Sequence, residues 1–225
     1  MNALSVIPFA GLGAVLGLDV VSFPQAMISR PLVAATLAGA LAGDPDRGLL
    51  IGAVLEMVAL GTLPFGAARY PDWGTASVVG GALYASGSAR GPGHLTLAVL
   101  GALIAAWLSS ESMVWLRTLN GRWTRAARSA AADARQNPAV ALQIRGLLGD
   151  LARGAMVTTV GLAVLVPAYG ALSTHWGGGA AVERALMAGL TSALGAATIW
   201  MLVRGTTGTR ALIAIGLIIG VALAI

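Results

Sequence analysis

Apolar residues come in long runs along this chain, and short polar breaks separate one run from the next. Runs of roughly 15 to 23 residues recur, and a helix of about 20 apolar residues spans the ~30 Å of hydrocarbon in a bilayer. The runs continue to the last residue, so a single signal peptide does not explain them. The expected long spans are Ala3–Val21, Leu95–Leu116, Ala155–Leu172, Ala185–Val203 and Ala211–Ile225.

The runs between residues 31 and 86 are shorter and interrupted. They are Pro31–Gly43, Leu49–Gly66 and Thr75–Ser86, and turn-forming residues at 44–48 and 69–74 separate them. Non-helical backbone at membrane depth is tolerated only where protein or a wet cavity surrounds it, as at the binding sites of transporters. The spacing therefore predicts re-entrant or broken helices in the N-terminal half, and tilted helices with slightly different ends are the alternative.

The amino-acid composition also indicates a membrane protein. Hydrophobic residues make up 57% of the 225 residues, and charged residues only 10%. A soluble domain carries about 25% charged residues, so this chain has too few to cover a water-soluble surface. We predict an all-α fold, a polytopic membrane helix bundle that forms one membrane domain.

Positive charge is concentrated in one segment. All 14 basic residues are Arg, and seven of them lie from Arg117 to Arg153. Cytoplasmic loops of membrane proteins carry an excess of basic residues, so we expect this segment in the cytoplasm. It divides the chain into an N-terminal membrane region (1–116), an Arg-rich cytoplasmic amphipathic connector (117–153) and a C-terminal membrane region (154–225).

The connector has helical periodicity. Arg122, Arg125 and Arg128 lie at helical spacing beside Trp123. That pattern fits an interfacial helix on anionic lipid, and it fits a solvated connector helix equally well. The same charge rule puts residues 204–210 in the cytoplasm, and the loop at 173–184 and the C-terminus outside.

The sequence lacks the residues that several kinds of catalytic and metal-binding site require. Cysteine is absent, and the only histidines, His94 and His175, are far apart, so the sequence offers no thiol nucleophile and no metal-ligand spacing. Neither a nucleophile–base pair nor a phosphate-binding loop is present. The basic segment also lacks the aromatic-interleaved strand pattern that stacks nucleic-acid bases. We expect no enzymatic activity of its own, no cofactor and no metal.

Glu56 is the most informative polar residue. It lies inside an apolar run, flanked by Leu55 and Met57. An ionised carboxylate at that depth costs several kcal/mol unless it faces a partner, a cavity or water. It could accept hydrogen bonds from sugar hydroxyls, relay a proton or bind a cation. The structural alternative is an ion pair with Arg30, which precedes the neighbouring apolar run.

Other polar residues flank the breaks. Asp19, Gln25 and Arg30 lie near the first break, and Asp72 lies near the second. Carboxylates accept hydrogen bonds and amides both donate and accept them, which suits a polyhydroxylated ligand. We count these four residues and Glu56 as candidate substrate-binding residues.

Two aromatic residues lie beside Asp72. Tyr70 and Trp73 could stack on the apolar face of a pyranose ring. Alternatively, Trp73 anchors a turn at the membrane interface.

One block of the sequence resembles a known family. The block contains Arg30-Pro31-Leu32-Val33-Ala34, Gly43-Asp44-Pro45, Leu55-Glu56-Met57, Gly66-Ala67-Ala68 and Pro71-Asp72. In this order it resembles the IIC membrane subunit of the mannose–fructose–sorbose family of bacterial phosphotransferase systems. The resemblance covers residues 30 to 80, and beyond them it is one of length and hydropathy only.

The resemblance implies a transport role. Such a IIC subunit works with a related IID membrane subunit, commonly as a trimer of IIC–IID pairs in the bacterial inner membrane. It moves a hexose or amino sugar by elevator-like alternating access, with the sugar between a mobile core and a static scaffold. A cytoplasmic IIB protein, phosphorylated on His by IIA, then phosphorylates the sugar, and the IIC chain carries no phosphorylated residue.

The resemblance also assigns positions. Glu56 and Asp72 occupy polar positions of the family pattern, and Arg30 matches the Arg before Pro-Leu-Val-Ala. Gln25 lies near a family glutamine, at a different distance from Arg30. Pro64 stands where members often carry Asn, and Pro has neither an amide side chain nor a backbone N–H.

Three functions follow from these observations. The first is the sugar-permease subunit of a phosphotransferase system. The second is a degenerate, non-transporting membrane scaffold or regulatory subunit, suggested by Pro64. The third is an ion-coupled carrier in which Glu56 is the titrating group.

Overall fold

The structure is a computed structural model that describes residues 3–20, 22–62, 69–87, 91–134 and 139–174, and scattered residues between 181 and 211. The described part holds six named helices and no strand, which confirms the predicted all-α fold. The helices are α1 (Ala3–Asp19), α2 (Pro31–Ala42), α3 (Pro45–Ala59), α4 (Trp73–Ser86), α5 (Pro92–Ala134) and α6 (Ala139–Thr174).

Helices α2 and α3 form a tight hairpin. Gly43 ends α2 in the left-handed conformation at φ 89°, and the Asp44 side chain then caps α3 by accepting from the Arg47 N–H at 3.1 Å. A Cβ at Gly48 would clash with the backbone carbonyl oxygen of Ala35, so glycine there allows the two helices to touch. The chain therefore reverses at Gly43 and Asp44, and residues 45–48 of the predicted turn instead form the first turn of α3, because Pro is favoured at the first helical position. Both helices are short.

Helix α4 is the centre of the bundle. Every residue from Trp73 to Ala85 is buried, and α1, α2, α3, α5 and α6 all pack against it. Its core partners include Ile51, Leu55 and Leu162. With 14 residues, α4 is only about 21 Å long, which is shorter than the hydrocarbon of a bilayer. The expected short helices of the N-terminal half are therefore present.

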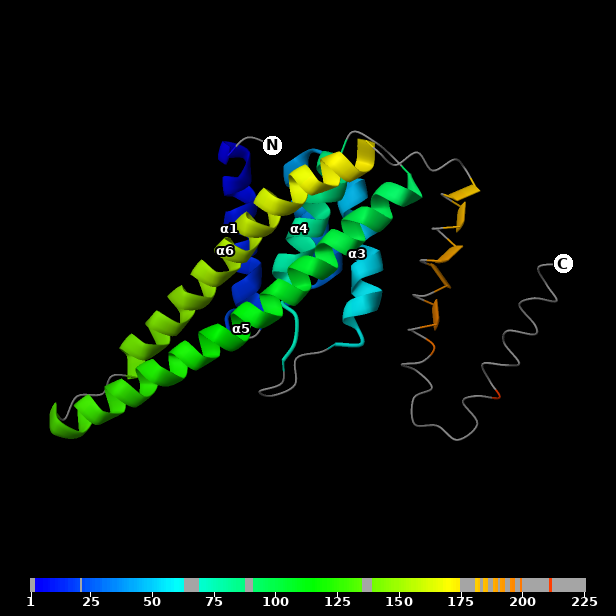
Figure 1. Cartoon of the computed structure of the whole chain (residues 1–225). Helices are drawn as coiled ribbons and strands as arrows, with labels where there is room; N and C mark the ends of the chain where they lie inside the picture. Colours follow the sequence, from blue (N-terminus) through cyan, green and yellow to red (C-terminus); the bar gives the residue numbers. More distant parts are fainter. Residues whose placement is uncertain are drawn as a thin grey trace.

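Helices α5 and α6 form a long antiparallel hairpin that projects beyond the bundle (Figure 1). Their 43 and 36 residues correspond to roughly 65 and 54 Å, well over the ~30 Å of hydrocarbon. By length and composition, these are the two helices in the described part that could cross a membrane. Two shorter helical segments are also apolar, namely Ser5–Asp19 of α1 and Pro31–Ala42, which is α2.

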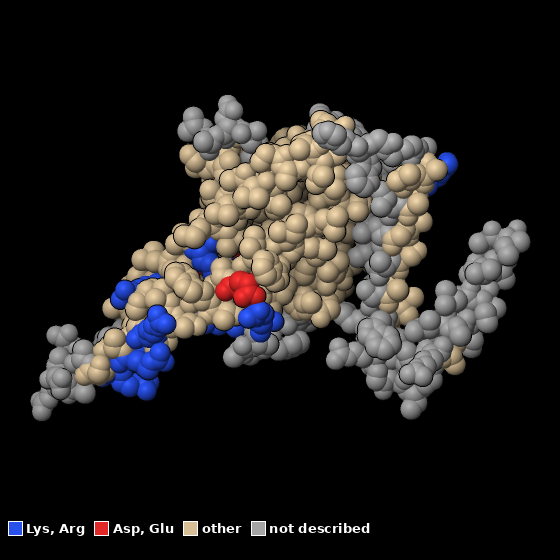
Figure 2. Space-filling view, viewed as in Figure 1, with Lys and Arg blue, Asp and Glu red and all other residues tan. Residues whose placement is uncertain are grey.

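The predicted Arg-rich connector does not begin or end where a helix does. Helix α5 continues from the apolar part through Arg117 to Ala134, and α6 begins at Ala139. The boundaries at 116/117 and 153/154 therefore fall inside helices. Ala and Arg are strong helix formers, so the change from apolar to charged residues does not end either helix. Figure 2 shows the basic side chains gathered on the projecting part of the hairpin.

Some expectations concern residues outside the described ranges. They include Pro64 and the block Gly66-Ala67-Ala68, and also His175 in the expected external loop. The expected spans 185–203 and 211–225 lie where only scattered residues are described.

Candidate functional site

All five candidate substrate-binding residues lie towards one end of the bundle. Asp19 ends α1, Gln25 lies in the α1–α2 loop and Arg30 precedes α2. Glu56 is in the last turn of α3, and Asp72 precedes α4. Because these helices alternate in direction, their polar ends meet on the side from which the α5–α6 hairpin projects (Figure 1).

Asp72 caps the central helix. Its Oδ1 accepts a hydrogen bond from the Thr75 N–H at 3.1 Å, which satisfies one free donor of the first turn. Its own N–H donates to Ser109 Oγ of α5 at 2.9 Å. The side chain is completely buried, so its charge requires a partner inside the protein.

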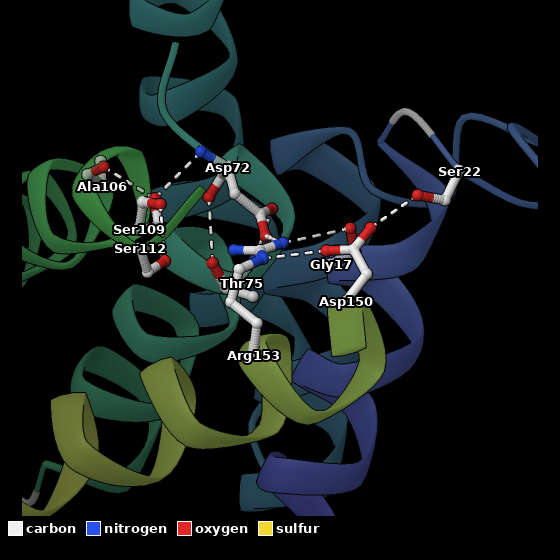
Figure 3. A network of polar contacts seen from close by, with 9 residues as sticks. All are labelled: Gly17, Ser22, Asp72, Thr75, Ala106, Ser109, Ser112, Asp150 and Arg153. Atoms are coloured by element: carbon white, nitrogen blue, oxygen red, sulfur yellow. Dashed lines mark hydrogen bonds and ion pairs between the residues drawn. The ribbon is translucent and has the colours of Figure 1, made fainter. Parts of the chain in front are cut away.

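That partner is Arg153 of α6 (Figure 3). Its Nη2 lies 2.8 Å from Asp72 Oδ2, and its Nε lies 2.9 Å from Asp150 Oδ1. The other Asp150 oxygen accepts from Ser22 Oγ in the α1–α2 loop at 2.6 Å. Arg153 Nη2 also donates to the Gly17 carbonyl of α1 at 3.4 Å. We call these contacts the Asp72–Arg153–Asp150 network.

The network is buried and carries unequal charge. Asp150 is 4% exposed and Arg153 is 6% exposed. Two carboxylates face one guanidinium, and Arg153 Nη1 has no hydrogen-bond partner among the described residues. Removing one member of a buried ion pair leaves a charge without compensation, which costs far more than the loss of an exposed pair. The network therefore ties α1, α4 and α6 together.

Sequence reasoning missed Arg153 because it counted this residue among the basic residues of a polar connector. The sequence nevertheless contains a pattern that could have indicated the buried role of Arg153. Asp150 lies three positions before Arg153, on the same helix face, directly before the apolar run that begins at Ala155. An Asp–Arg pair at the start of an apolar run indicates buried charge rather than a solvated arm.

Glu56 is paired with Arg30. Glu56 Oε1 lies 2.9 Å from Arg30 Nε, and Oε2 accepts from the Leu32 N–H at 3.2 Å. The ion pair that the sequence offered as the structural alternative is thus formed. The side chains are 40% exposed for Arg30 and 19% for Glu56, so this pair is far more open than the Asp72–Arg153–Asp150 network.

Asp19 holds the α1–α2 loop in shape. It is 2% exposed, and its two oxygens accept from the Ala26 N–H at 2.6 Å and the Ser29 N–H at 2.9 Å. Gln25 is exposed on the same loop and has a positive φ of 58°. The loop also reaches Asp150 through Ser22, and Arg30 follows it, so it connects the two groups of charged residues.

The two aromatic candidates are covered in this conformation. Tyr70 is 5% exposed, and the Arg117 guanidinium lies 4.8 Å from its ring centroid. Trp73 is 9% exposed and donates its Nε1–H to Thr62 Oγ1 at 2.7 Å. Stacking of a sugar ring on either residue would require these neighbours to move.

The arrangement suits the binding of a polar ligand rather than covalent chemistry. It offers carboxylates, a guanidinium and hydroxyls at the end of an apolar bundle. In the described ranges no three His, Cys, Asp or Glu side chains are grouped so that they could hold a metal ion. Hydrogen-bond acceptors and donors at fixed positions are what a polyhydroxylated molecule requires.

Comparison with known families gives a match along nearly the whole chain. A family model described as the sorbose-specific IIC component of the PTS system matches residues 3–219. The sorbose-specific EIIC component of Klebsiella pneumoniae is 32% identical over 126 residues, which cover 56% of this chain and 43% of that protein. The mannose-specific EIIC component of Escherichia coli K12 is 40% identical over 78 residues, 35% of this chain and 27% of that protein. Each match thus spans less than half the length of the curated relative.

Two solved structures share the fold. A cryo-EM structure of the mannose transporter ManYZ with microcin E492 aligns with a TM-score of 0.64 at 21% identity, over 98% of this chain and 87% of that chain. A structure described as a membrane protein aligns with a TM-score of 0.67 at 23% identity, over 100% of this chain and 96% of that one. At these identities the similarity concerns the fold alone.

Proposed function

Because this chain belongs to the family of sorbose-specific IIC components of the phosphotransferase system, we propose that it is the sugar-permease subunit of such a system. In this role it moves a hexose or amino sugar across the cytoplasmic membrane of a bacterium, as a multi-pass protein. The observation that carries the proposal is the set of paired charged residues at one end of an otherwise apolar bundle. Charged residues in such a setting are expensive and are usually functional.

The five candidate residues take different roles in this proposal. Glu56 and Arg30 form the open pair, and a sugar hydroxyl can replace either partner in its hydrogen bonds. Gln25 lies exposed on the α1–α2 loop, and Asp19 holds that loop in place through the two hydrogen bonds that it accepts. Asp72 is the buried end of the site, where Arg153 neutralises it.

We assign transport to elevator-like alternating access. Support comes from the short helices α2, α3 and α4, none of which is long enough to span the hydrocarbon. Short or interrupted helices around a polar site are typical of transporters in which the site moves past a fixed scaffold.

Phosphorylation is assigned to other proteins. The proposed partners are a IID membrane chain, a IIB protein that donates phosphate from a phospho-His, and IIA, which recharges it. The membrane assembly is a trimer of IIC–IID pairs.

The Arg-rich end of the hairpin faces the cytoplasm in this proposal. Exposed arginines gather there, namely Arg122, Arg125, Arg128 and Arg145. The excess of basic residues on the cytoplasmic side supports this orientation. A cysteine introduced at Thr118 would then react with an impermeant maleimide only after the cells are opened.

Uptake in cells tests the function. The chain is expressed with its IID, IIB and IIA partners in a strain that lacks its own mannose-type systems. Labelled mannose, fructose and sorbose are offered, since the two relatives above are described as sorbose-specific and mannose-specific and the sequence resembles the mannose–fructose–sorbose family. We expect accumulation of sugar phosphate that requires phosphoenolpyruvate. Uptake that ignores phosphoenolpyruvate and collapses with an uncoupler would instead point to an ion-coupled carrier. A folded complex that takes up none of the sugars would point to a scaffold.

A further inference from the structure

A cavity of about 340 Å³ lies at the base of the α5–α6 hairpin. Its polar lining comes from Ser22 of the α1–α2 loop, Arg117 and Asn120 of α5, and Gln143 and Asp150 of α6. The volume falls at the lower end of the range of small-molecule pockets, about 300–1,000 Å³. None of the five candidate substrate-binding residues lines it.

One lining group is left without a partner. The side-chain oxygen of Asn120 is buried and has no hydrogen-bond partner among the described residues. A buried amide oxygen without a partner is unfavourable, so a rotation of the Asn120 side chain that brings this oxygen against a ligand hydroxyl in the cavity would be favourable. Gln143, from the facing helix, adds a second amide to the same cavity. Amides donate and accept at once, as hydroxyl groups do.

The charges of the lining favour a neutral ligand. Asp150 is ionically paired with Arg153 and accepts from Ser22, and Arg117 lies over the Tyr70 ring. One carboxylate and one guanidinium balance each other, so the cavity offers no surplus charge to an anion such as a lipid phosphate. Leu116 and Leu147 supply an apolar wall for the C–H face of a sugar ring.

The cavity adjoins the candidate site. Asp150 and Ser22 belong both to its lining and to the Asp72–Arg153–Asp150 network. It lies on the side of the network from which the Arg-rich hairpin projects. A ligand in the cavity would therefore contact the network through Ser22 and Asp150.

We propose that this cavity is a second binding site for a neutral sugar, located between the Asp72–Arg153–Asp150 network and the Arg-rich end of the hairpin. The inference rests on the proposed function, because it takes its ligand from the transport of sugars. It assigns Asn120 and Gln143 as the residues that bind sugar hydroxyls on the release side.

Cysteine labelling gives a direct test, because the chain contains no cysteine of its own. Leu147→Cys places a thiol in the cavity and leaves both amides in place, and Ile144→Cys places one about one turn earlier on the same helix, outside the lining, where the residue is 53% exposed. Both variants are labelled with a maleimide in opened membranes that contain the complete complex, with and without mannose, fructose or sorbose. A sugar at about ten times its Kd occupies about nine-tenths of the sites and slows labelling about tenfold. We expect this protection at Leu147→Cys and not at Ile144→Cys.

A cavity-filling variant tests whether the sugar protects the thiol by occupying the cavity or by a conformational change caused by binding elsewhere. A Cβ at Gly146 would lie 3.9 Å from the Asn120 amide nitrogen, an ordinary contact, so Gly146→Leu fills the cavity without strain on the backbone. Gly170→Leu on the same helix is the control, since no atom lies within 4 Å of its Cβ. In the Leu147→Cys background, Gly146→Leu should raise the sugar concentration for half-maximal protection at least about tenfold, or about 1.4 kcal/mol of binding. Gly170→Leu should leave it unchanged.

The outcomes distinguish this inference from the proposed function. If phosphoenolpyruvate-dependent uptake persists but no sugar protects Leu147→Cys, the second site is wrong and the permease assignment stands. Protection that Gly146→Leu leaves unchanged also overturns the second site. Protection by phosphatidylglycerol vesicles but by none of the sugars overturns the choice of ligand. If the unmodified chain takes up none of the sugars and none protects the thiol, both proposals fail together.

Discussion

The guanidinium of Arg153 lies 2.8 Å from the carboxylate of Asp72, although 81 positions separate these residues in the chain. Asp72 begins the central helix α4, and Arg153 lies on α6, one arm of the long hairpin. Both side chains are almost completely buried. This single contact therefore fixes the buried end of the candidate site to the hairpin.

Loss of the Arg153 charge should destabilise the protein strongly. In Arg153→Gln, Asp72 and Asp150 keep their hydrogen bonds from Thr75 and Ser22 but stay buried without the positive charge that both of them face. Breaking a buried ion pair from one side costs about 3–5 kcal/mol. We expect a large loss of folded protein in detergent, measured by size-exclusion chromatography and thermal unfolding.

Two further variants test the cause of that loss. Arg128→Gln removes an equal charge from an exposed position of the hairpin and should leave the unfolding temperature nearly unchanged. Arg153→Lys keeps the charge but loses the forked geometry that reaches both carboxylates, so it should rescue stability only in part. Equal stability of Arg153→Gln and Arg128→Gln would contradict the structural role of the network.

The Arg30–Glu56 pair should matter for transport more than for stability. An exposed ion pair is worth about 0–1 kcal/mol, and Arg30 is 40% exposed. Glu56→Gln keeps the size of the side chain and leaves an acceptor for the Leu32 N–H. We expect a near-native unfolding temperature together with a clear rise in the KM of sugar uptake. An unchanged KM would remove Glu56 from the sugar site.

Asp19 should act through the shape of the α1–α2 loop. Asp19→Ala leaves the N–H groups of Ala26 and Ser29 without their acceptors, and each lost hydrogen bond of this kind costs about 1–3 kcal/mol. Asp19→Asn keeps one good acceptor and should have a smaller effect. Limited proteolysis, followed by mass spectrometry, should show faster cleavage between residues 22 and 30 in Asp19→Ala than in Asp19→Asn. Equal cleavage rates in both variants and the unmodified chain would refute this role.

Much of the helical part could be predicted from the sequence. The break between α2 and α3 was predictable because Gly43 favours the end of a helix, and Asp44 and Pro45 favour the start of the next. The short helices α2 and α4 follow the predicted apolar runs. The end of α5 at Ala134 and the start of α6 at Ala139 were not predictable from charge, because arginine and alanine continue a helix as well as leucine does.

Of the two ion pairs at the candidate site, only the one between neighbouring helices could be predicted from the sequence. Glu56 and Arg30 lie on the two adjacent helices of a hairpin, so their pairing could be offered as an alternative. The pairing of Asp72 with Arg153 depends on the packing of α6 against α1 and α4, which no local pattern reports. The same long-range packing creates the cavity beside Asn120.

The close contact inside the α2–α3 hairpin gives the last prediction. A methyl group at Gly48 would clash with the Ala35 carbonyl oxygen and would also come within 2.9 Å of the Gly39 Cα, both of which belong to helix backbone that cannot move aside cheaply. Gly48→Ala should therefore separate α2 from α3 and lower stability by about 1–3 kcal/mol, as overpacking does. Gly11→Ala is the matched control, because no atom lies within 4 Å of the added methyl and alanine favours a helix. Thermal unfolding of the purified complex should show a lower midpoint for Gly48→Ala and an unchanged or higher one for Gly11→Ala. Since the hairpin holds Arg30 beside Glu56, the KM of sugar uptake should rise in Gly48→Ala as well. A Gly48→Ala variant with native stability and native KM would show that the two helices are not in contact at this point.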